Sequence, residues 1–549
     1  MRSYFFVPTP GTSSGSLDMR ENPVTKLTRS LALGASILAL SACGPDEIVS
    51  PGTGGNVTIN NPPPTGGGGG TPTPTPTGVT PANGCPTIAD SQGLTDEGTI
   101  TGPEGTWRVC ATPLRFNASS TLPRVPGLLY RLPGQVNVGT DGGPAADNSD
   151  GLSDTDVTLT IEPGVIIYAS GSSFLNVTRG NAIDANGTAA LPIVFTSRDN
   201  VLGLNTNDSS GQWGGVVLSG RAPVTDCFEP GARPGTVDCE RQVEGASDPS
   251  FFGGATSNDS SGSMSYVQIR YSGFVLSGDN ELQSLTTGGT GTGTQLSYIQ
   301  SINSSDDGVE FFGGFVNLKH LIVAGAEDDS IDTDTGVKAN MQFVLAAQRD
   351  GVGDTIIEAD SSNGLEDQTP RQNTRIANAT FIQRNSRDQV IRLRGGTDYT
   401  LVNTLIVDAS SAGTPCIRID DQETVRSANS GLDDVGPPRF QSVGLDCATD
   451  FRDGSDGVTA AQVEGFFDAG TGNNKSYTNT LVNGYLNGTG ENAYAPIYDA
   501  TRLGSFFETA NYIGAVSSSD NWTQGWTCDS SALVFGNNTG NCANIPVFN

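Results

Sequence analysis

The stretch LSYIQSINSSDDGVEFFGGFVNLKHLIVAGAEDDSIDTDTGVKANMQFVLAAQ (296–348) decides the expected fold. Three runs of apolar and β-branched residues begin in it at Leu296, Leu318 and Met341, so the runs are 22 and then 23 residues apart. Gly, Asp, Asn and Ser lie between the runs, and the pattern lacks a helical period. Such a near-constant spacing predicts repeating units that bury one another's faces.

Similar runs extend over most of the chain, from VTLTIEPGVII (157–167) to VNTLIVDAS (402–410). Parallel strands need a long crossover between them, and here each crossover contains a second short strand instead of a helix. We therefore predict an all-β fold, a right-handed parallel β-helix over residues 155–500, with coils stacked ~4.8 Å apart. The alternative, an antiparallel sandwich, predicts two-residue Asn-Gly hairpins, and these are sparse in the sequence.

Three strings carry a resemblance to a known family. GQWGGVVLSGRAPV (211–224), DDGVEFFGGFVNLKHLIVAGAEDDSIDTD (306–334) and FFETANYIGAVSSSDNWTQGW (506–526) resemble segments of a family of β-helical bacterial lipoproteins that is largely uncharacterised. The resemblance covers most of residues 155–530. It implies the fold and no particular chemistry.

The N-terminal segment predicts export and lipidation. From Met19, which is an alternative start, a basic region precedes the apolar run 30–42, which is too short to span a bilayer. We read residues 1–43 as a signal peptide ending in the lipobox-like string LSAC. In lipoproteins with such a string the cysteine, here Cys43, is lipidated, and Gly44 after it implies the outer membrane. An ordinary signal peptide cut nearby is the alternative.

The remaining boundaries follow from composition. Residues 44–84, which are rich in Pro, Gly and Thr, predict a disordered linker. We expect an N-terminal cap region at 85–154 and a C-terminal cap segment at 501–549. Eight cysteines remain after Cys43, and their local spacing favours four disulfides: Cys85–Cys110, Cys227–Cys239, Cys416–Cys447 and Cys528–Cys542.

The net charge argues against nucleic-acid binding. With 59 acidic and 29 basic residues the formal charge is −30, which repels DNA, RNA and anionic lipid headgroups. Such a charge suits solubility and divalent cations. The single histidine, His320, gives little support to His-based metal sites or a Ser-His-Asp triad, and we expect it to be packed or at the surface of a strand.

Acidic residues recur at equivalent places in three consecutive repeats. The predicted register puts Glu310, Asp332 and Glu358 in one row and Asp307 and Asp329 in another. Stacked carboxylates ~5 Å apart repel by roughly 3 kcal/mol per pair at an effective dielectric of 20. Calcium, with its hard oxygen ligands, would relieve this at Asp307, Asp329, Glu310 and Asp332. An exposed row screened by water is the alternative, and the lack of a DxDxDG calcium loop favours it.

Arginines follow the acidic row in the sequence. The same register continues it with Arg392 and Arg418, and six arginines fall between 371 and 394: Arg371, Arg375, Arg384, Arg387, Arg392 and Arg394. Arginine forks suit carboxylate, sulfate or phosphate, so a groove for an acidic glycan is one interpretation. The other, which we favour, is that they neutralise the acidic row. Trp213, Trp522 and Trp526 are candidate sugar platforms, although packing is the commoner role.

Two main classes of function remain open, and a purely structural surface protein is a third possibility. The first is a non-catalytic, outer-membrane-anchored lipoprotein of the cell envelope that binds a glycan or a protein, including an outer-membrane protein. The second is a calcium-dependent polysaccharide lyase or glycosidase on acidic glycans, using Glu310, Asp332 and Glu358 with Arg392 or Arg418. The Gly-His-Gly and Arg-Ile-Lys elements of polygalacturonases are missing from the sequence, which disfavours the enzyme.

Overall fold

The computed structural model describes residues 78–548, except 244–245, 247–249, 278–279 and 362–363. The predicted signal peptide, Cys43 and residues 44–77 of the predicted linker lie outside the described residues. By its contacts the chain divides into Met1–Thr73 and Pro74–Asn549, and the second unit is described here. None of its described helices is long and apolar enough to cross a lipid bilayer.

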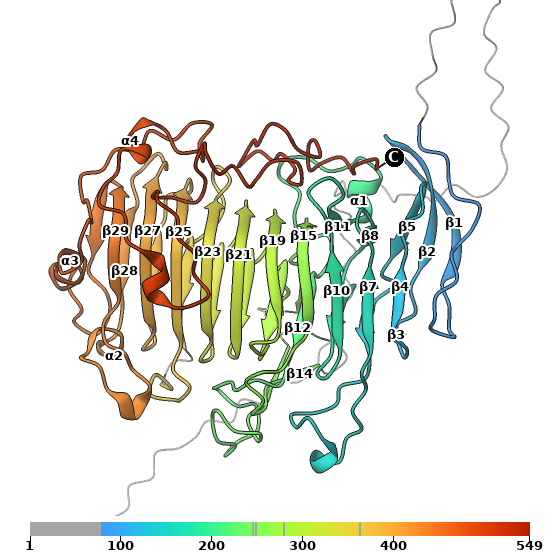
Figure 1. The fold of residues 1–549 in the computed structure, drawn as a ribbon, viewed down its shortest axis with the longest axis horizontal. Helices are drawn as coiled ribbons and strands as arrows, with labels where there is room; N and C mark the ends of the chain where they lie inside the picture. The colour runs from blue at the N-terminus through green and yellow to red at the C-terminus, as the bar shows by residue number, and fades with distance from the viewer. Residues whose placement is uncertain (1–77, 244–245, 247–249, 278–279, 362–363, 549) are drawn as a thin grey trace, which may run out of the picture. The chain divides into compact units, whose positions relative to one another are not determined.

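Short strands form two large sheets in the described residues (Figure 1). The strands of sheet A are β1 (Thr95–Gly102), β2 (Gly105–Ala111), β4 (Ser120–Leu122), β5 (Leu128–Arg131), β7 (Thr158–Ile161), β8 (Ile166–Ala169), β10 (Ala182–Asn186), β11 (Ile193–Ser197), β15 (Gly262–Arg270), β19 (Gln295–Ile302), β21 (Phe315–Ala324), β23 (Lys338–Ala347), β25 (Asn373–Gln383), β27 (Asp398–Asp408) and β29 (Arg439–Asp446). Those of sheet B are β3 (Arg115–Phe116), β6 (Gln135–Val138), β9 (Phe174–Val177), β12 (Val216–Ser219), β18 (Leu285–Gly288), β20 (Val309–Phe312), β22 (Ile331–Asp334), β24 (Ile357–Ala359), β26 (Ile391–Leu393), β28 (Pro415–Ile419) and β30 (Thr449–Arg452).

The predicted coil is confirmed. From β18 to β30 the chain alternates between the two sheets, and each strand pairs in parallel with the strand one coil later. Leu296 pairs with Leu318, and Leu318 pairs with Met341, so the period in the sequence is the circumference of one coil. The fold is a right-handed parallel β-helix.

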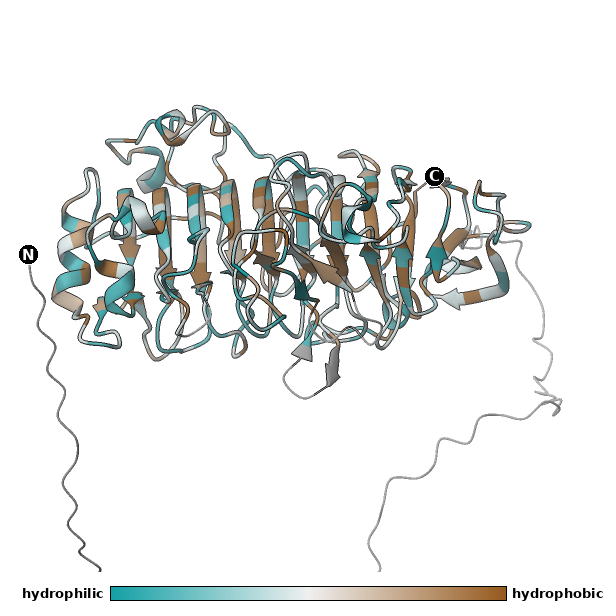
Figure 2. Ribbon diagram, turned by 90° about the horizontal axis from the view of Figure 1, so that it is seen from below, coloured by the Kyte–Doolittle hydropathy of each residue, from teal (hydrophilic) through white to brown (hydrophobic). Residues whose placement is uncertain are grey.

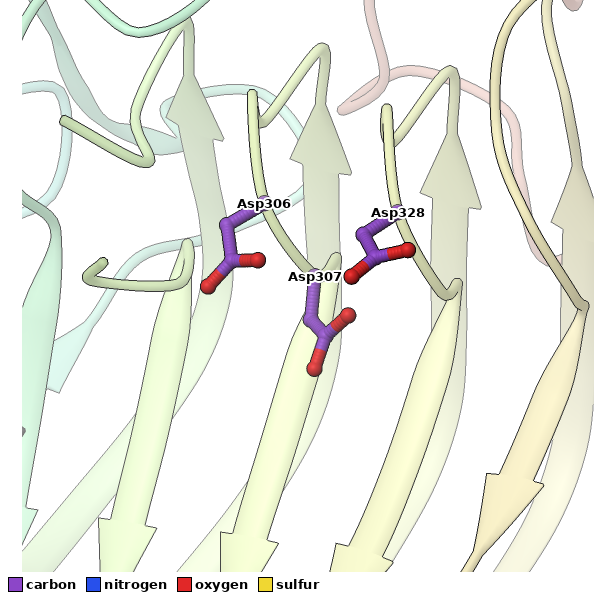
Figure 3. Close-up of side chains that lie close together, drawn as sticks. All are labelled: Asp306, Asp307 and Asp328. Atoms are coloured by element: carbon purple, nitrogen blue, oxygen red, sulfur yellow. The ribbon is translucent and has the colours of Figure 1, made fainter. Parts of the chain in front are cut away.

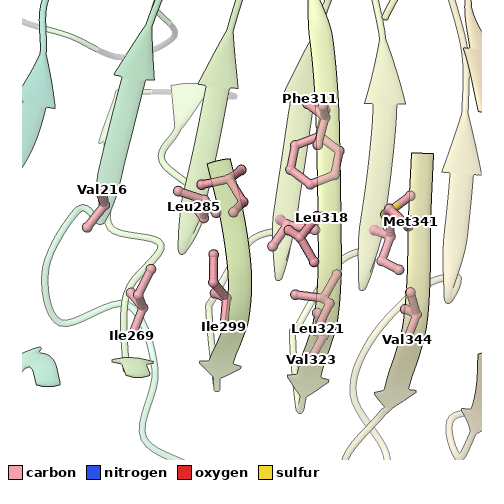
Figure 4. Packing of buried hydrophobic residues seen from close by; sticks show 14 of the residues in the cluster. Val216, Ile269, Leu285, Ile299, Phe311, Leu318, Leu321, Val323, Met341 and Val344 are labelled. Carbon is pink, nitrogen blue, oxygen red and sulfur yellow. The ribbon is translucent and has the colours of Figure 1, made fainter. Parts of the chain in front are cut away.

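The interior of the coils is apolar. Along each strand the side chains alternate between the interior and the outer face, and Figure 2 shows hydrophobic residues repeating on neighbouring strands. Leu318 and Leu321 of β21, Phe311 of β20 and Val344 of β23 are completely buried and stack on their counterparts in adjacent coils (Figure 4). Like residues therefore lie over like residues inside, and the same register governs the outer face.

The coils begin and end earlier than predicted. Parallel pairing starts with β2 and β5 and with β3 and β6, within the predicted cap region 85–154, and the last coil strand, β30, ends at Arg452 rather than near 500. The predicted linker also ends too late, because Val79 already pairs with Gly105. These first strands are short and polar on one side, so they lack the continuous apolar runs that mark later coils.

Each end of the coil stack is covered. The antiparallel strand β1 covers the edge of β2, and helix α3 (Ala460–Asp468) covers the last coil. The ring of Phe467 on α3 packs against Phe440 and Phe451, with ring centroids 5.6 and 5.4 Å apart. Both elements shield strand edges and apolar side chains that would otherwise meet water.

A column of stacked rings runs along the outside of sheet A. Tyr266, Tyr298, His320 and Phe343, here called the aromatic column, occupy the same position in β15, β19, β21 and β23, each with a positive φ. Successive ring centroids are 4.2, 4.1 and 4.9 Å apart and nearly parallel. Left-handed backbone is unfavourable for bulky residues, and the stacking offsets this cost.

The C-terminal segment 496–548, here called the strap, covers the aromatic column. Gln300 exchanges two hydrogen bonds of 2.9 Å with the backbone of Cys528, and Gln342 does the same with Glu508. At the far end, Arg124 donates to the carbonyl oxygen of Phe548 (3.2 Å). The predicted cap segment 501–549 therefore does not close an end of the solenoid; it runs back along sheet A as part of the strap.

The four predicted disulfides are confirmed, namely Cys85–Cys110, Cys227–Cys239, Cys416–Cys447 and Cys528–Cys542. Cys227–Cys239 holds together a long excursion, residues 221–255, which leaves the coil after β12 and contains the small hairpin β13 (Arg241–Gln242) and β14 (Phe251–Phe252). Phe252 and Val224 of the excursion pack on Val217 and Phe312 of sheet B. This excursion decides which part of the outer face of sheet B stays open.

Candidate functional site

One outward position of sheet B carries a row of charged residues. Strand pairing places Glu310, Asp332 and Glu358 in register on β20, β22 and β24, as predicted. The row continues with Arg392 on β26 and Arg418 on β28, which confirms the predicted register across the irregular stretch before β26. Arg452 on β30 extends it by one coil. We call these six residues the charged strip.

A second acidic line lies in the turns that lead into these strands. Asp307 and Asp329 occupy equivalent places one coil apart, and the amide of Asp329 donates to Asp307 Oδ1 (2.9 Å). Figure 3 shows Asp307 beside Asp306 and Asp328. Four overlapping groups have carboxylate oxygens within 4.8 Å of one another: Asp306, Asp307 and Asp328; Asp307, Glu310 and Asp332; Asp328, Asp329 and Asp354; Asp329, Asp332 and Glu358.

These carboxyls are poorly solvated. Asp307 and Asp329 are only 5% and 3% exposed. Burial raises the pKa of both well above its usual value, and the neighbouring carboxylates, including Asp306 and Glu358, add to the effect. Asp329 Oδ1 accepts from the amide (2.7 Å) and hydroxyl (2.6 Å) of Thr355, which partly offsets it.

Asp332 is the acidic residue of the charged strip with a buried oxygen that lacks a described hydrogen-bond partner. Burial raises its pKa well above the usual value, and the negative charge of Glu358 raises it further. Its Oδ1 is shielded from solvent and has no hydrogen-bond donor among the described residues. A buried, unpaired carboxylate oxygen is costly unless a proton or a cation meets it.

The arginine half of the strip is neutralised within the protein. Arg392 bonds Glu358 Oε1 (3.0 Å) and Asp420 Oδ2 (2.8 Å), and Arg418 bonds Asp420 Oδ1 (2.8 Å). Arg394 also reaches Glu358 (3.2 Å) and Asp360 (2.8 Å). Glu358 is thus the junction between an acidic half, whose neighbours in the register are carboxylates, and a half with paired charges.

The predicted arginine patch is only partly present. Arg392 and Arg394 do neutralise acidic residues, as expected. Arg371 is instead buried against Asp398 (3.0 Å), while Arg375 and Arg384 donate to strap carbonyl oxygens, those of Leu503 (3.1 Å) and Ala532 (2.7 Å). Arg387 donates to the carbonyl oxygen of Gly353 (2.8 Å) and lies 3.5 Å from Asp354 of the acidic groups, so it also neutralises part of them. Arginines that are close together in the sequence of a β-helix can lie on different faces. One coil takes only 22–23 residues, so a separation of a few residues already turns the chain toward another face.

The excursion closes one end of the charged strip. Val217 and Thr286, the row positions on β12 and β18 before Glu310, are buried beside the excursion's apolar cluster. Glu310 on β20 is itself only 8% exposed, so the strip becomes open to solvent from Asp332 on β22.

The acidic half of the site offers ligands for a cation, and Arg392 does not offer a general base. Carboxylate oxygens in a cluster are hard ligands of the kind calcium prefers. Although burial acts to lower it, the pKa of Arg392 is raised overall by its bonds to Asp420 and by Glu358, so this guanidinium stays protonated and cannot accept a proton. Trp213, Trp522 and Trp526 are buried, so they pack rather than offer sugar platforms.

Comparison with known protein families agrees with this architecture. The model of the pectate-lyase-like beta helix domain family matches residues 149–527. No curated protein matches the chain. The crystal structure of the Acinetobacter baumannii phage AM24 tailspike protein matches at 11% identity, with a TM-score of 0.22. That match covers 61% of this chain and half of the tailspike chain. Because the family model covers most of the chain, the protein belongs to the pectate-lyase-like beta helix family.

Proposed function

We propose that the protein is a non-catalytic, glycan-binding lipoprotein of the bacterial cell envelope, and that a divalent cation takes part in binding. The observation that carries the proposal is the acidic half of the charged strip, where Asp307, Glu310, Asp329 and Asp332 converge and Asp332 Oδ1 has no described donor. A calcium ion would supply the missing positive charge and would keep coordination positions for an outside ligand.

The arginine half supports an acidic glycan as that ligand. The side chains of Arg392 and Arg452 are 27% and 38% exposed, so each guanidinium keeps donors on its solvent side while its other donors bind acidic residues. Guanidinium forks match carboxylate and sulfate groups. A polysaccharide lying along the strip would place one acidic group on the cation and the next on the arginines.

Anchoring is part of the proposal and rests on the sequence. A lipid on Cys43 and the Pro/Gly/Thr-rich segment after it would hold the solenoid at the outer membrane, in reach of envelope glycans. An outer-membrane protein is the second kind of partner that an exposed coil face can accommodate.

The test is calcium binding measured by isothermal titration on the purified, chelator-treated protein. We expect saturable binding, and at least a tenfold loss of affinity in Asp332→Asn. Asp468→Asn, at an exposed carboxylate on α3, is the matched control and should bind like the wild type. Absence of calcium binding would contradict the cation site.

Glycan binding is tested on an array of acidic and neutral polysaccharides with calcium and with EDTA. Calcium-dependent capture of acidic glycans is the expected result. The enzyme alternative is tested by assaying for unsaturated products. Product that forms with calcium and disappears in Arg392→Ala would overturn the non-catalytic assignment.

A further inference from the structure

The row that carries the charged strip has a second open segment, on the other side of the excursion. Strand pairing continues the same outward position back from Val217 to Asn176 on β9, Asn137 on β6 and Arg115 on β3. These three polar residues share a face with the charged strip, but the buried residues Val217 and Thr286 lie between the two segments.

A cavity of about 140 Å³ opens over this segment. Arg115, Asn137 and Asn176 line it, together with Asp141 and the ring of Phe251 from the excursion. The cavity is large enough to hold several waters, which is room for one small polar ring. Polar groups and one aromatic face around a concave space are the usual make-up of a small-ligand site.

The cavity walls are held in place by their own hydrogen bonds. Asn137 Oδ1 accepts from Asn176 Nδ2 (2.9 Å) and from Gln135 Nε2 (3.2 Å). Within the described residues, both bonds of the Asn137 amide use Oδ1, so Nδ2 keeps its donors for a ligand. Asn137 and Asn176 are themselves almost fully buried, which fixes the direction of these donors.

Opposite charges complete the polar lining. Arg179 bonds both oxygens of Asp141, each at 2.7 Å, and so orients that carboxylate. Arg115 spends Nη1 on the carbonyl oxygen of Gly139 (2.6 Å), and its other donors are available on the cavity side. The site therefore offers donors from Arg115 and Asn137 and an acceptor at Asp141, but no cluster of carboxylates that would hold a metal.

An aromatic pair forms the remaining side. Phe251 lines the cavity, and Phe228 meets it edge to face with ring centroids 5.8 Å apart. Phe228 is 54% exposed, so part of this aromatic pair faces solvent. Aromatic faces pack against the C–H face of a sugar ring, while amide, guanidinium and carboxylate groups bind its hydroxyls.

We propose that this cavity, here called the Arg115 pocket, binds a single neutral monosaccharide unit, a hexose or an N-acetylhexosamine, without a cation. The pocket is separate from the charged strip, so the two sites would recognise different parts of a glycan or different glycans. If the Arg115 pocket binds no sugar, the proposal of a cation-dependent site on the charged strip still stands. If the charged strip binds no cation, the proposal for the pocket is likewise unaffected.

The experiment is saturation-transfer-difference NMR on the purified protein in EDTA, with a panel of neutral hexoses and N-acetylhexosamines. At least one sugar should receive saturation, and Arg115→Met should weaken its binding at least tenfold. Asn137→Asp is the second variant, because it keeps the Oδ1 acceptor and removes the Nδ2 donors. It should also weaken binding at least tenfold, and it decides the test if Arg115→Met does not fold.

Two variants serve as controls. Arg233→Gln, on the same excursion with a 77% exposed side chain, and Asp332→Asn, in the charged strip, should both bind the sugar like the wild type. No transfer to any sugar, or transfer unchanged in Arg115→Met and Asn137→Asp, would overturn the proposal. Loss in Asp332→Asn with no loss in Arg115→Met would place the sugar on the charged strip and would also overturn it.

Discussion

The aromatic column on sheet A and the charged strip on sheet B are built by the same coil register, yet they differ in what stacking like residues costs. Rings attract one another, so the column of Tyr266, Tyr298, His320 and Phe343 is stabilised by repetition. Carboxylates repel, so repetition of Glu310, Asp332 and Glu358 destabilises the strip unless something intervenes. A stacked carboxyl such as Asp332, whose Oδ1 has no donor among the described residues, therefore marks a place that serves something other than stability.

The aromatic column and the charged strip also differ in whether another segment of the chain covers them. The strap buries the aromatic column under Trp522 and Trp526, whereas the strip from β22 onward keeps part of its charge in contact with solvent. Variants that remove a covering ring from the aromatic column, or a charge from the charged strip, test this comparison.

The largest effect is expected from Trp526→Ala. This ring is fully buried and meets Tyr266 and Tyr298 edge to face, with centroids 5.8 and 5.9 Å away. Removing a buried tryptophan typically costs about 3–5 kcal/mol, so the free energy of unfolding in urea should fall by that amount. A loss below about 1 kcal/mol would mean that the strap adds little to the solenoid.

Asp332→Asn should have the opposite sign when no cation is bound. Like charges ~5 Å apart repel by roughly 3 kcal/mol at an effective dielectric of 20, so neutralising Asp332 should stabilise the chelator-treated protein by about 1–3 kcal/mol at pH 8. Urea unfolding in EDTA measures this, with Asp468→Asn as the control. Destabilisation in EDTA would show that the ionised Asp332 is already satisfied within the protein.

The strip should also make stability fall as the pH rises. Burial raises the pKa of Asp360, beside the strip, to about 7, and that of Asp332 is raised too. The folded protein then holds a proton on Asp360 that the unfolded chain releases, so this stabilisation is complete below about pH 4 and is lost as the pH rises through about 7. In that window Asp360 changes the free energy of unfolding by about 1.4 kcal/mol per pH unit, and the raised pKa of Asp332 acts in the same direction. Saturating calcium should flatten the fall.

The aromatic column predicts the opposite pH response, and His320→Phe isolates it. Burial lowers the pKa of His320 to about 3, so the folded state excludes a proton that the unfolded chain binds below about pH 6.5. His320 therefore contributes stability above pH 6.5 that is lost as the pH falls toward 3.

At pH 7.5 the His320→Phe change should be under about 1 kcal/mol, because a ring of similar size replaces one whose Nδ1 has no described partner. From pH 6.5 downward the variant should gain on the wild type, by about 1.4 kcal/mol per pH unit. Parallel pH profiles for the two proteins would show that His320 is protonated normally in the folded state.

The regular part of the molecule was predictable from its sequence. The period of 22–23 residues in the sequence places Glu310, Asp332 and Glu358 in one row. Coils with a nearly constant number of residues repeat the directions of their side chains. The same reasoning extended to Arg392 and Arg418. The disulfides followed from local spacing.

The strap, the excursion and the Arg115 pocket were not predictable in this way. The bonds of Gln300 to Cys528 join residues 228 positions apart, and such contacts leave no period in the sequence. Arg115 lies in β3, which has only two residues, so it gave no strand signal. Arg452 was missed because its strand β30, Thr-Asp-Phe-Arg, has a single apolar residue.

The return path of the strap has a consequence for synthesis. Its last residues contact Arg124 and Asn200, in some of the first coils to be made. A chain emerging from the ribosome can stack its coils one after another, but it cannot shield the aromatic column until Trp522 and Trp526 have emerged. Loss of residues 542–548 would uncover Arg124 and Asn200, so the coils made first are the last to be covered.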